Sequence, residues 1–171
     1  MNLTLSSDSK IGSTLSGGID SSILVACVNN EIRNIQLNFE QECFSACFYE
    51  KKIDESKYIF TVTNKLKLNT NKVYPTFTHF EKEFDKLVWH QEEPFPTMSI
   101  YAHYCVFEEA AKRNVRIILN GQGADEMLAG YHYYYPTYFN ELKTNRFYAK
   151  LNSEWKSYKH NIQSEMPLFS E

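Results

Sequence analysis

Residues 14–22 read TLSGGIDSS, a stretch in which two adjacent glycines join an apolar strand to an apolar helix. Adjacent glycines can take positive φ and bring successive N–H groups together, and the start of the following helix adds unpaired N–H groups and partial positive charge. A Walker-type loop would carry a lysine beside its closing Ser or Thr, and this stretch has none. The stretch therefore predicts either a phosphate-binding loop of another kind or a glycine turn in which Asp20 and Ser21 cap a helix.

Strand and helix patterns alternate along the rest of the chain. Apolar runs predict strands at residues 11–16, 43–48 and 115–119. Residues 67–73 predict a more polar strand, which suits an edge of the sheet. Helical spacing predicts helices at residues 20–30, 54–66, 80–88 and 99–113, the first of them buried on more than one face. Strands that alternate with helices imply a parallel sheet with right-handed crossovers. The predicted fold is α/β, a doubly wound parallel sheet of about four to five strands with helices on both faces.

A second loop with glycines and acids, NGQGADE at residues 120–126, directly follows the strand expected at residues 115–119. In the common strand order 3-2-1-4 the chain reverses direction across the sheet between its first and fourth strands, and ligands bind at the carboxyl ends of the strands there. Both loops follow those two strands. Two such loops at one predicted crevice favour a ligand site over two unrelated turns.

Composition narrows the class of protein. The 171 residues, 43% of them hydrophobic and 23% charged, predict one domain with a sizeable core. A formal net charge of −3 and the lack of a Lys/Arg block argue against a nucleic-acid partner. No apolar run approaches the roughly 18 residues that span a membrane, and the N-terminus lacks a basic and apolar leader pattern. A cytoplasmic protein with no membrane partner is therefore expected, in which Cys27, Cys43, Cys47 and Cys105 are buried, reduced thiols.

The two loops together carry a resemblance to a known family. SGGIDSS at residues 16–22 resembles the SGGxDS signature of the N-type ATP pyrophosphatases, the PP-loop superfamily. NGQGADE, continuing to Gly130 and Tyr131, resembles the SGEGADE…GGY signature of the asparagine synthetases, and residues 92–94, EEP, lie between the two motifs. The resemblance extends from about Ser6 to Tyr148.

The resemblance implies a single ATP-binding synthetase domain over residues 1–171 that is incomplete at both ends. A glutaminase domain would place a catalytic cysteine after the initiator Met, where this chain has Asn2, and the family continues with a helical part after the point where this chain stops. The implied reaction uses MgATP to activate the side-chain carboxylate of aspartate as an acyl-adenylate, with release of pyrophosphate, for attack by ammonia. A separate glutaminase domain or subunit is a possible partner and source of ammonia.

The resemblance also implies a role for individual residues. The backbone at Thr14 and Ala46 would contact adenosine, and Asn120 and Gly121 would flank the α-phosphate. The residues implied to hold pyrophosphate are Ser16, Gly17, Gly18, Asp20, Ser21 and Ser22. Asp20 and Asp125 would bind Mg²⁺, and with Gln122 they form the implied catalytic set. Gln122 replaces a family Glu, and Asn120 replaces the Ser that opens the motif.

Alternative interpretations remain open. The same loops suit a related peptide or β-lactam cyclase without a glutaminase domain, or a non-catalytic nucleotide-binding fragment. Glu92 and Glu93 are interpreted either as lining the amino-acid side of the cleft or as helix-end charges. Three further patterns are assigned to packing or to solvent. These are a packing stripe of Tyr101, Tyr104, Cys105, Phe107 and Ala111, a packed or interfacial run at residues 131–136, and a solvated face of Lys143, Arg146 and Lys150.

Overall fold

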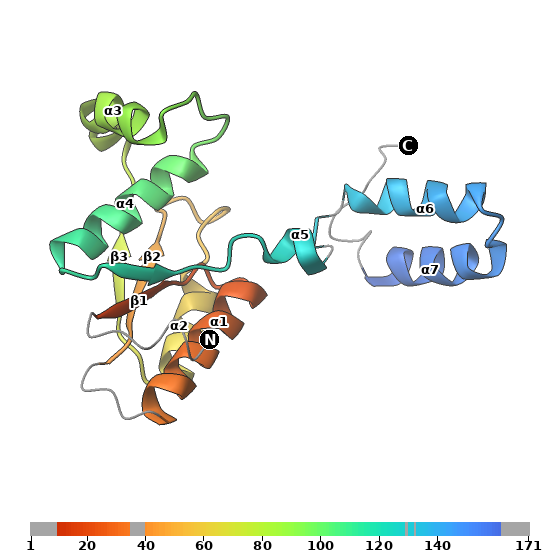
Figure 1. Cartoon of the computed structure of the whole chain (residues 1–171), viewed down its shortest axis with the longest axis horizontal. Helices are drawn as coiled ribbons and strands as arrows, with labels where there is room; N and C mark the ends of the chain where they lie inside the picture. Colours follow the sequence, from red (N-terminus) through yellow and green to blue (C-terminus); the bar gives the residue numbers. More distant parts are fainter. Residues whose placement is uncertain (1–9, 35–39, 129, 132, 162–171) are drawn as a thin grey trace. The chain divides into compact units, whose positions relative to one another are not determined.

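The computed structural model describes residues 10–34, 40–128, 130–131 and 133–161 (Figure 1). The chain forms two compact units, Met1–Gly121 and Gln122–Glu171. The first unit contains the sheet, and the second contains three helices among its described residues. These units are defined by how the chain packs and not by function. The prediction of one synthetase domain over residues 1–171 therefore stays a prediction.

The sheet of the first unit has four parallel strands in the order β3-β2-β1-β4. They are β1 (Ile11–Thr14), β2 (Glu42–Ala46), β3 (Thr70–Val73) and β4 (Ile117–Leu119). Ser13 of β1 is in register with Cys43 of β2 on one side and with Leu119 of β4 on the other. This order confirms the predicted reversal between the first and fourth strands, and β3 lies at an edge as expected.

The helices fall between the strands as the sequence predicts. Their bounds in the first unit are α1 (Ile19–Asn34), α2 (Ser56–Leu66), α3 (Phe77–Gln91) and α4 (Ser99–Lys112). The second unit holds α5 (Ala124–Leu128), α6 (Tyr134–Thr144) and α7 (Tyr148–Asn161). Helix α1 runs a turn beyond the predicted end because Ile32 continues its buried face and packs with Ile11 and Val28.

Alternating side chains of β2 show that helices cover both faces of the sheet. Cys43 and Cys47 are buried in one cluster with residues of α1 and α2, whereas Phe44 is buried in another cluster with residues of α4. Successive side chains of a strand point to opposite faces, so these two clusters lie on opposite sides of the sheet. The predicted α/β fold with two helix layers is confirmed.

Helix α4 presents a different stripe to the core from the one predicted. Its buried residues are Tyr101, Ala102, Cys105, Val106 and Ala110. Phe107 and Ala111 were expected in the stripe but are exposed, because the buried residues of α4 pack against β2 and against Leu87 of α3. Phe107 and Ala111 lie outside these clusters and line an open pocket with residues of α3. Leu87 anchors α3 in a cluster with Tyr101 and Cys105.

The outer face of α1 corrects two further expectations. Ile23 is 57% exposed and Cys27 is exposed, so α1 is buried on one face only. The two residues are four apart and share the helix face opposite Val25 and Val28. The other three cysteines are buried as expected, and burial raises the pKa of the Cys43 thiol to about 12, which leaves it protonated and unreactive at neutral pH.

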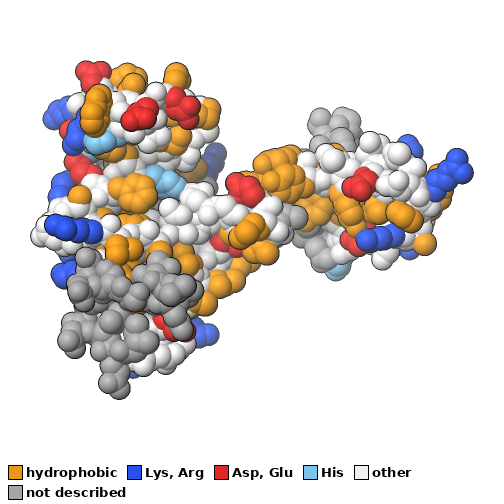
Figure 2. All heavy atoms as spheres, in the orientation of Figure 1, with side chains coloured by type: hydrophobic (Ala, Val, Ile, Leu, Met, Phe, Trp, Pro, Cys, Tyr) orange, Lys and Arg blue, Asp and Glu red, His pale blue; other side chains and the backbone are white. Residues whose placement is uncertain are grey.

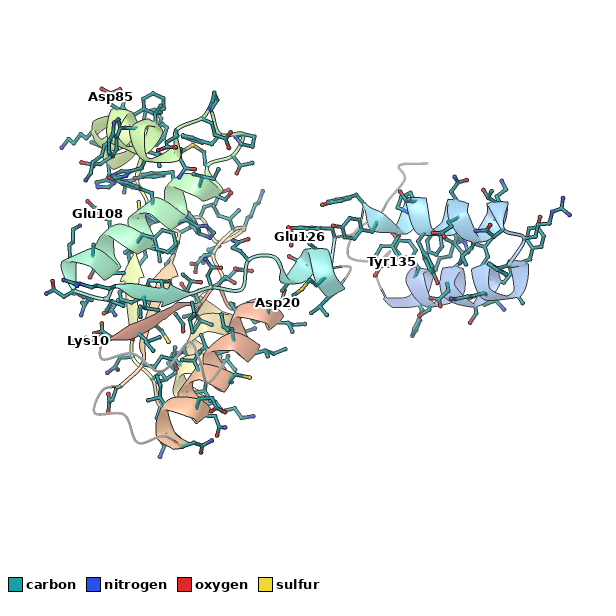
Figure 3. All side chains as sticks on the ribbon, in the orientation of Figure 1. Lys10, Asp20, Asp85, Glu108, Glu126 and Tyr135 are labelled. Atoms are coloured by element: carbon teal, nitrogen blue, oxygen red, sulfur yellow. The ribbon has the colours of Figure 1, made fainter. Side chains whose placement is uncertain are left out.

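Helices α6 and α7 of the second unit form a hairpin held by aromatic side chains. Tyr135 lies between the two helices (Figure 3) with its ring 5.0 Å from that of Tyr158, and Phe139 meets Trp155 edge to face at 5.0 Å. The expected packing of the run at residues 131–136 is thus confirmed for Tyr135, whereas His132 lies outside the described residues. Lys143, Arg146 and Lys150 are exposed as expected. Within the described residues, no helix has the length and hydropathy to cross a membrane.

Candidate functional site

The backbone at Leu15, between the carboxyl end of β1 and the first glycine loop, is held in place by hydrogen bonds. Leu15 is buried, and its amide donates to the carbonyl oxygen of Phe44 at 2.9 Å. The buried Ser45 hydroxyl donates to the Leu15 carbonyl at 2.6 Å. The backbone is therefore held on both sides immediately before Ser16, which limits how far the loop can move.

Serine hydroxyls brace the loop from within. Ser16 Oγ lies 3.0 Å from Ser21 Oγ and accepts from the Gly18 amide at 3.3 Å. The hydroxyls of Ser21 and Ser22 both donate to the Gly18 carbonyl, at 3.2 and 2.6 Å. Each predicted pyrophosphate-binding serine thus also holds the loop in shape.

Helix α1 begins within this loop, so the N–H groups of its first turn lie beside the loop amides. The Gly18 carbonyl accepts the first helical hydrogen bond, from the Ser22 amide at 3.1 Å. Helical geometry gives no intrahelical partner to the N–H groups before Ser22, and such groups bind anions. Asp20 lies in this first turn, half-buried (Figure 3). The site can therefore offer amide donors for phosphate oxygens and one carboxylate for a cation.

The second glycine segment reaches the same turn from β4. Asn120 and Gly121 follow the strand, and a Cβ on Gly121 would lie 3.0 Å from the Ser21 nitrogen and 3.3 Å from the Asp20 carbonyl carbon. These distances are tighter than ordinary Cβ contacts, so a side chain at Gly121 would force the two backbones apart by a few tenths of an ångström. The structure thus brings Asn120 and Gly121 together with the first loop, as predicted from the strand order.

The remaining predicted site residues divide between the two units. Thr14 and Ala46 lie at the carboxyl ends of β1 and β2, where backbone groups of both strands end beside the loop. Gln122 and Asp125 belong to the second unit, where Asp125 is half-buried in α5. Within the first unit the structure brings Gly121 to the first loop, whereas Gln122 and Asp125 are described within the second unit.

Within the second unit the chain folds back tightly onto Asp125. The Gly130 amide donates to the Asp125 carbonyl at 2.9 Å. A Cβ on Gly130 would overlap the Asp125 carboxylate oxygen Oδ1 and lie 2.9 Å from its Cγ. The Tyr131 hydroxyl donates to Glu126 Oε1 at 3.2 Å. Gly130 therefore leaves the space that the Asp125 carboxylate occupies.

The start of α2 is a part of the site that sequence reasoning missed. Gly17 has φ +94°, and a Cβ there would lie 2.8 Å from Tyr58 Cβ and 3.2 Å from the Ile59 nitrogen. The loop therefore packs directly on the first turn of α2. The chain carries only an indirect signal for this contact, the Asp-Glu-Ser run at residues 54–56 that begins a helix.

The Asp54 carboxylate links the start of α2 to the segment that follows β2 through two hydrogen bonds. Its Oδ1 accepts from the Phe48 amide at 3.1 Å and from the Ser56 hydroxyl at 2.8 Å. These two hydrogen bonds favour the ionised form and hold the pKa of the Asp54 carboxyl below its usual range. The carboxylate thus links the sheet to the helix on which Gly17 rests.

An Asp54→Asn variant is expected to be less stable than the wild type at neutral pH and to approach it in acid. Because the folded-state pKa is depressed, the charge stabilises the fold above the unfolded pKa of about 3.9, and this contribution is lost as pH falls through the folded pKa. Urea unfolding at several pH values would measure the difference. Glu50→Gln, which changes an exposed carboxylate in the connection between β2 and α2, is the matched control. A pH-independent effect of Asp54→Asn would contradict the assignment.

The described residues contain no group of three or more His, Cys, Asp or Glu side chains that could hold a metal ion by themselves. Mg²⁺ at phosphate sites needs less, because one or two carboxylates act together with phosphate oxygens and waters. Asp20, beside the amides of the α1 first turn, fits that donor set. The site chemistry therefore suits a magnesium-bound polyphosphate better than a free metal ion.

Glu92 and Glu93 lie at the end of α3. Glu92 ends the helix with φ +60°, and its amide donates to the Val88 carbonyl at 3.0 Å. Both glutamates are exposed and line an open pocket. Their interpretation as helix-end charges is confirmed, and contact with the amino-acid substrate stays a prediction.

Comparisons with known proteins point to one family. The asparagine synthase family model matches residues 1–171. Glutamine-hydrolyzing asparagine synthetase 1 of Bacillus subtilis is 33% identical over 137 residues, which are 78% of this chain and 20% of that protein. Putative glutamine-hydrolyzing asparagine synthetase 2 of Methanocaldococcus jannaschii is 36% identical over 129 residues, 75% of this chain and 24% of that protein.

Two other comparisons are more distant. Amidase chyE of Penicillium rubens is 28% identical over 140 residues, 75% of this chain and 20% of that protein. The NH3-dependent NAD synthetase of Campylobacter jejuni aligns with 76% of this chain and 55% of its own, with a TM-score of 0.46 and 16% identity. That structural likeness is too weak to carry an argument, so the fold rests on the observed strand order. The chain spans about a fifth to a quarter of the length of the curated relatives named here.

Proposed function

Because the chain belongs to the asparagine synthase family, we propose that it is the nucleotide-binding part of an ATP-dependent amide-forming ligase. The observation that carries the proposal is the contact between Gly121 and the first turn of α1, where the glycine loop, Asp20 and the end of β4 meet. Amide donors and a carboxylate in one place suit a magnesium-bound triphosphate.

The proposed reaction has two steps. The side-chain carboxylate of aspartate attacks the α-phosphorus of ATP, so that a C–O–P bond forms and pyrophosphate leaves. Ammonia then attacks the carbonyl carbon of the acyl-adenylate and displaces AMP, which gives asparagine. Such displacements depend mainly on positioning and on neutralising the leaving charge.

The proposed roles of the residues follow the two motifs. The amides of the loop and of the α1 first turn hold pyrophosphate, with the hydroxyls of Ser16, Ser21 and Ser22. The backbone at Thr14 and Ala46 contacts adenosine, and Asn120 and Gly121 flank the α-phosphate. Mg²⁺, bound by Asp20 and Asp125, would neutralise phosphate charge. Gln122 orients the intermediate with a neutral amide.

A second candidate performs the same activation on a different carboxylate or with a different amine. Amidase chyE and, at 24% identity, amidase chry2 of Gibberella zeae each match 75% of this chain, about the same share as the synthetases match. Because both relatives are named amidases, their similarity supports amide chemistry on a carboxylate or amine other than those of asparagine synthesis. Peptide and β-lactam cyclases belong to this second candidate.

A pyrophosphate-release assay distinguishes the candidates. The chain is incubated with ATP and Mg²⁺, with aspartate and ammonia added separately and together. Aspartate-dependent release supports the first candidate, and release with another carboxylate supports the second. Binding of MgATP without release under any of these conditions would indicate a nucleotide-binding fragment, and the absence of ATP binding would contradict the proposal itself.

A Gly130→Ala variant is expected to need about 10- to 100-fold more Mg²⁺ for half-maximal ATP binding, since a Cβ displaces the Asp125 carboxylate. Isothermal titration of ATP at several Mg²⁺ concentrations measures the change. Tyr131→Phe is the matched control, because it removes the neighbouring bond to Glu126 and leaves Asp125 in place. If Gly130→Ala and Tyr131→Phe need the same Mg²⁺ concentration for half-maximal ATP binding, Asp125 is not a magnesium ligand.

A further inference from the structure

A cluster of polar side chains around His79 joins α3 to α4, and the proposed reaction does not use it. His79 lies in the first turn of α3, and its Nδ1 is 2.9 Å from the hydroxyl oxygen of Tyr101 on α4. Its Nε2 is 3.6 Å from Glu108 Oε2, also on α4. The His79 side chain is 37% exposed, and Figure 2 shows histidine side chains at the surface over α3 and α4. The ring can therefore exchange protons with solvent.

The Tyr101 hydroxyl decides which nitrogen of His79 carries a proton, because the hydroxyl has only one proton to donate. Tyr101 donates that proton to the Thr76 carbonyl oxygen at 2.9 Å. Burial raises the pKa of Tyr101, so the hydroxyl keeps its proton at neutral pH. With this proton directed at Thr76, the Tyr101 oxygen only accepts from the ring. His79 Nδ1 is therefore the donor in their contact.

The Glu108 carboxylate requires a proton on the other nitrogen of the ring. An ionised carboxylate only accepts hydrogen bonds, so its contact with Nε2 is attractive when Nε2 also carries a proton. A neutral imidazole has one N–H group and satisfies either Tyr101 or Glu108. A charged imidazolium has two N–H groups and satisfies both. The observed geometry of His79 therefore suits the charged ring.

Three further titratable groups surround the ring. These are Cys105 and Lys112 of α4 and Glu83 of α3. Burial raises the pKa of the Cys105 thiol, so this group adds no charge at neutral pH. Lys112 lies 3.2 Å from the same Glu108 oxygen and shares its charge, and the N-terminal end of α3 disfavours a cation in the first turn. A charged His79 therefore depends on Glu108, with Glu83 as a second acid nearby.

We propose that His79 is a pH-dependent link between α3 and α4, which holds the first turn of α3 in place while its ring is charged. Histidine gains its second proton between about pH 8 and about pH 5. The link therefore stabilises the fold in mild acid. As the pH rises, the ring loses one proton, and its contact with either Tyr101 or Glu108 is lost or becomes repulsive. The proposal concerns the packing of the two helices and does not depend on the proposed ligase reaction.

A double-mutant cycle, measured at about pH 5.5 and about pH 8, tests the link. The variants are His79→Gln, Glu108→Gln and both together, because glutamine stays polar and does not titrate. The melting temperatures should show a coupling of about 3 °C in acid and below about 1 °C at the higher pH. The measurements contain no ATP or Mg²⁺, so their outcome is separate from that of the pyrophosphate-release assay.

The matched control is the ion pair of Arg113 and Glu109, whose Nε and Oε1 atoms lie 2.8 Å apart at the end of α4. The cycle of Arg113→Gln and Glu109→Gln should give the same coupling at both pH values, because arginine stays charged. In a Tyr101→Phe background the coupling of His79 to Glu108 should persist at the higher pH, since a neutral ring then holds its one proton on Nε2.

Three results would each overturn the proposal. The first is an equal coupling of His79 to Glu108 at both pH values, and the second is the absence of coupling in acid. The third is an unchanged pH dependence in the Tyr101→Phe background, because the Tyr101 hydroxyl would then not decide where the ring carries its proton.

Discussion

An Asp20→Asn variant is expected to lose about 10²-fold or more of the Mg²⁺-dependent part of its ATP affinity. Asp20 is the acid in the first turn of α1, within the segment on which Gly121 packs. Asparagine has nearly the same size and keeps an acceptor oxygen, so the change removes mainly the negative charge. A neutral amide binds Mg²⁺ far more weakly than a carboxylate does, and the bound triphosphate would then lack part of its charge compensation.

The measurement compares ATP binding with Mg²⁺ and with EDTA. The variant should resemble the wild type in EDTA and differ from it only when Mg²⁺ is present. Asp85→Asn, an exposed acid on α3, is the control for a change of net charge. An Mg²⁺ dependence equal to that of the wild type would show that Asp20 is no metal ligand.

Stability can be separated from binding in the same variant. A carboxylate near a helix N-terminus contributes about 0.3–1 kcal/mol through the helix dipole. A shift of that size in the free energy of unfolding is too small to explain a 10²-fold loss of binding, which corresponds to about 2.7 kcal/mol. Thermal unfolding of Asp20→Asn without ligand measures this change in stability. A much larger loss of stability would mean that the lower ATP affinity comes from misfolding.

Three of the strands were predictable because each one is a short apolar run next to a glycine or a charged turn. The more polar β3 was predictable as an edge strand. Residues 115–119 and 11–16 both lead directly into glycine loops, and the reversal between them follows from the usual handedness of parallel crossovers. The contact of Gly121 with Ser21 agrees with that expectation. The roles of these residues toward ATP stay predictions.

The errors concern features that depend on tertiary contacts. The Asn29-Asn30 pair suggested a helix end, but Asn29 is buried and Ile32 continues the packed face of α1. Ile23 and Cys27 are apolar enough to suggest burial, yet no described element covers that side of the helix. Hydrophobicity alone does not distinguish a core residue from an exposed apolar one.

The contact between Gly17 and α2 could not be read from the sequence, because it joins segments about forty residues apart with no shared pattern. A glycine pair before a helix indicates only that one of the glycines needs positive φ. The structure identifies Gly17 as that residue and Tyr58 and Ile59 as its neighbours.

A Gly17→Ala variant is expected to be destabilised by about 3 kcal/mol, because strain at positive φ costs roughly 1–3 kcal/mol and the new Cβ meets backbone and Cβ atoms that cannot rotate away. For a chain of this length the melting temperature should fall by roughly 10 °C. Displacement of the loop from α2 would also weaken ATP binding. Thermal unfolding followed by circular dichroism measures the first effect, and titration with MgATP measures the second.

Gly18→Ala is the decisive comparison for Gly17→Ala, because the two residues are adjacent but differ in conformation and surroundings. Gly18 does not have positive φ, and its Cβ would meet only Ser16 Oγ, at an ordinary 3.4 Å. The stability of Gly18→Ala should therefore stay within about 0.5 kcal/mol of the wild type. The added methyl group would nevertheless occupy the proposed pyrophosphate site, so ATP binding should fall. Normal ATP binding by Gly18→Ala would mean that the loop is a structural turn and that phosphates bind elsewhere.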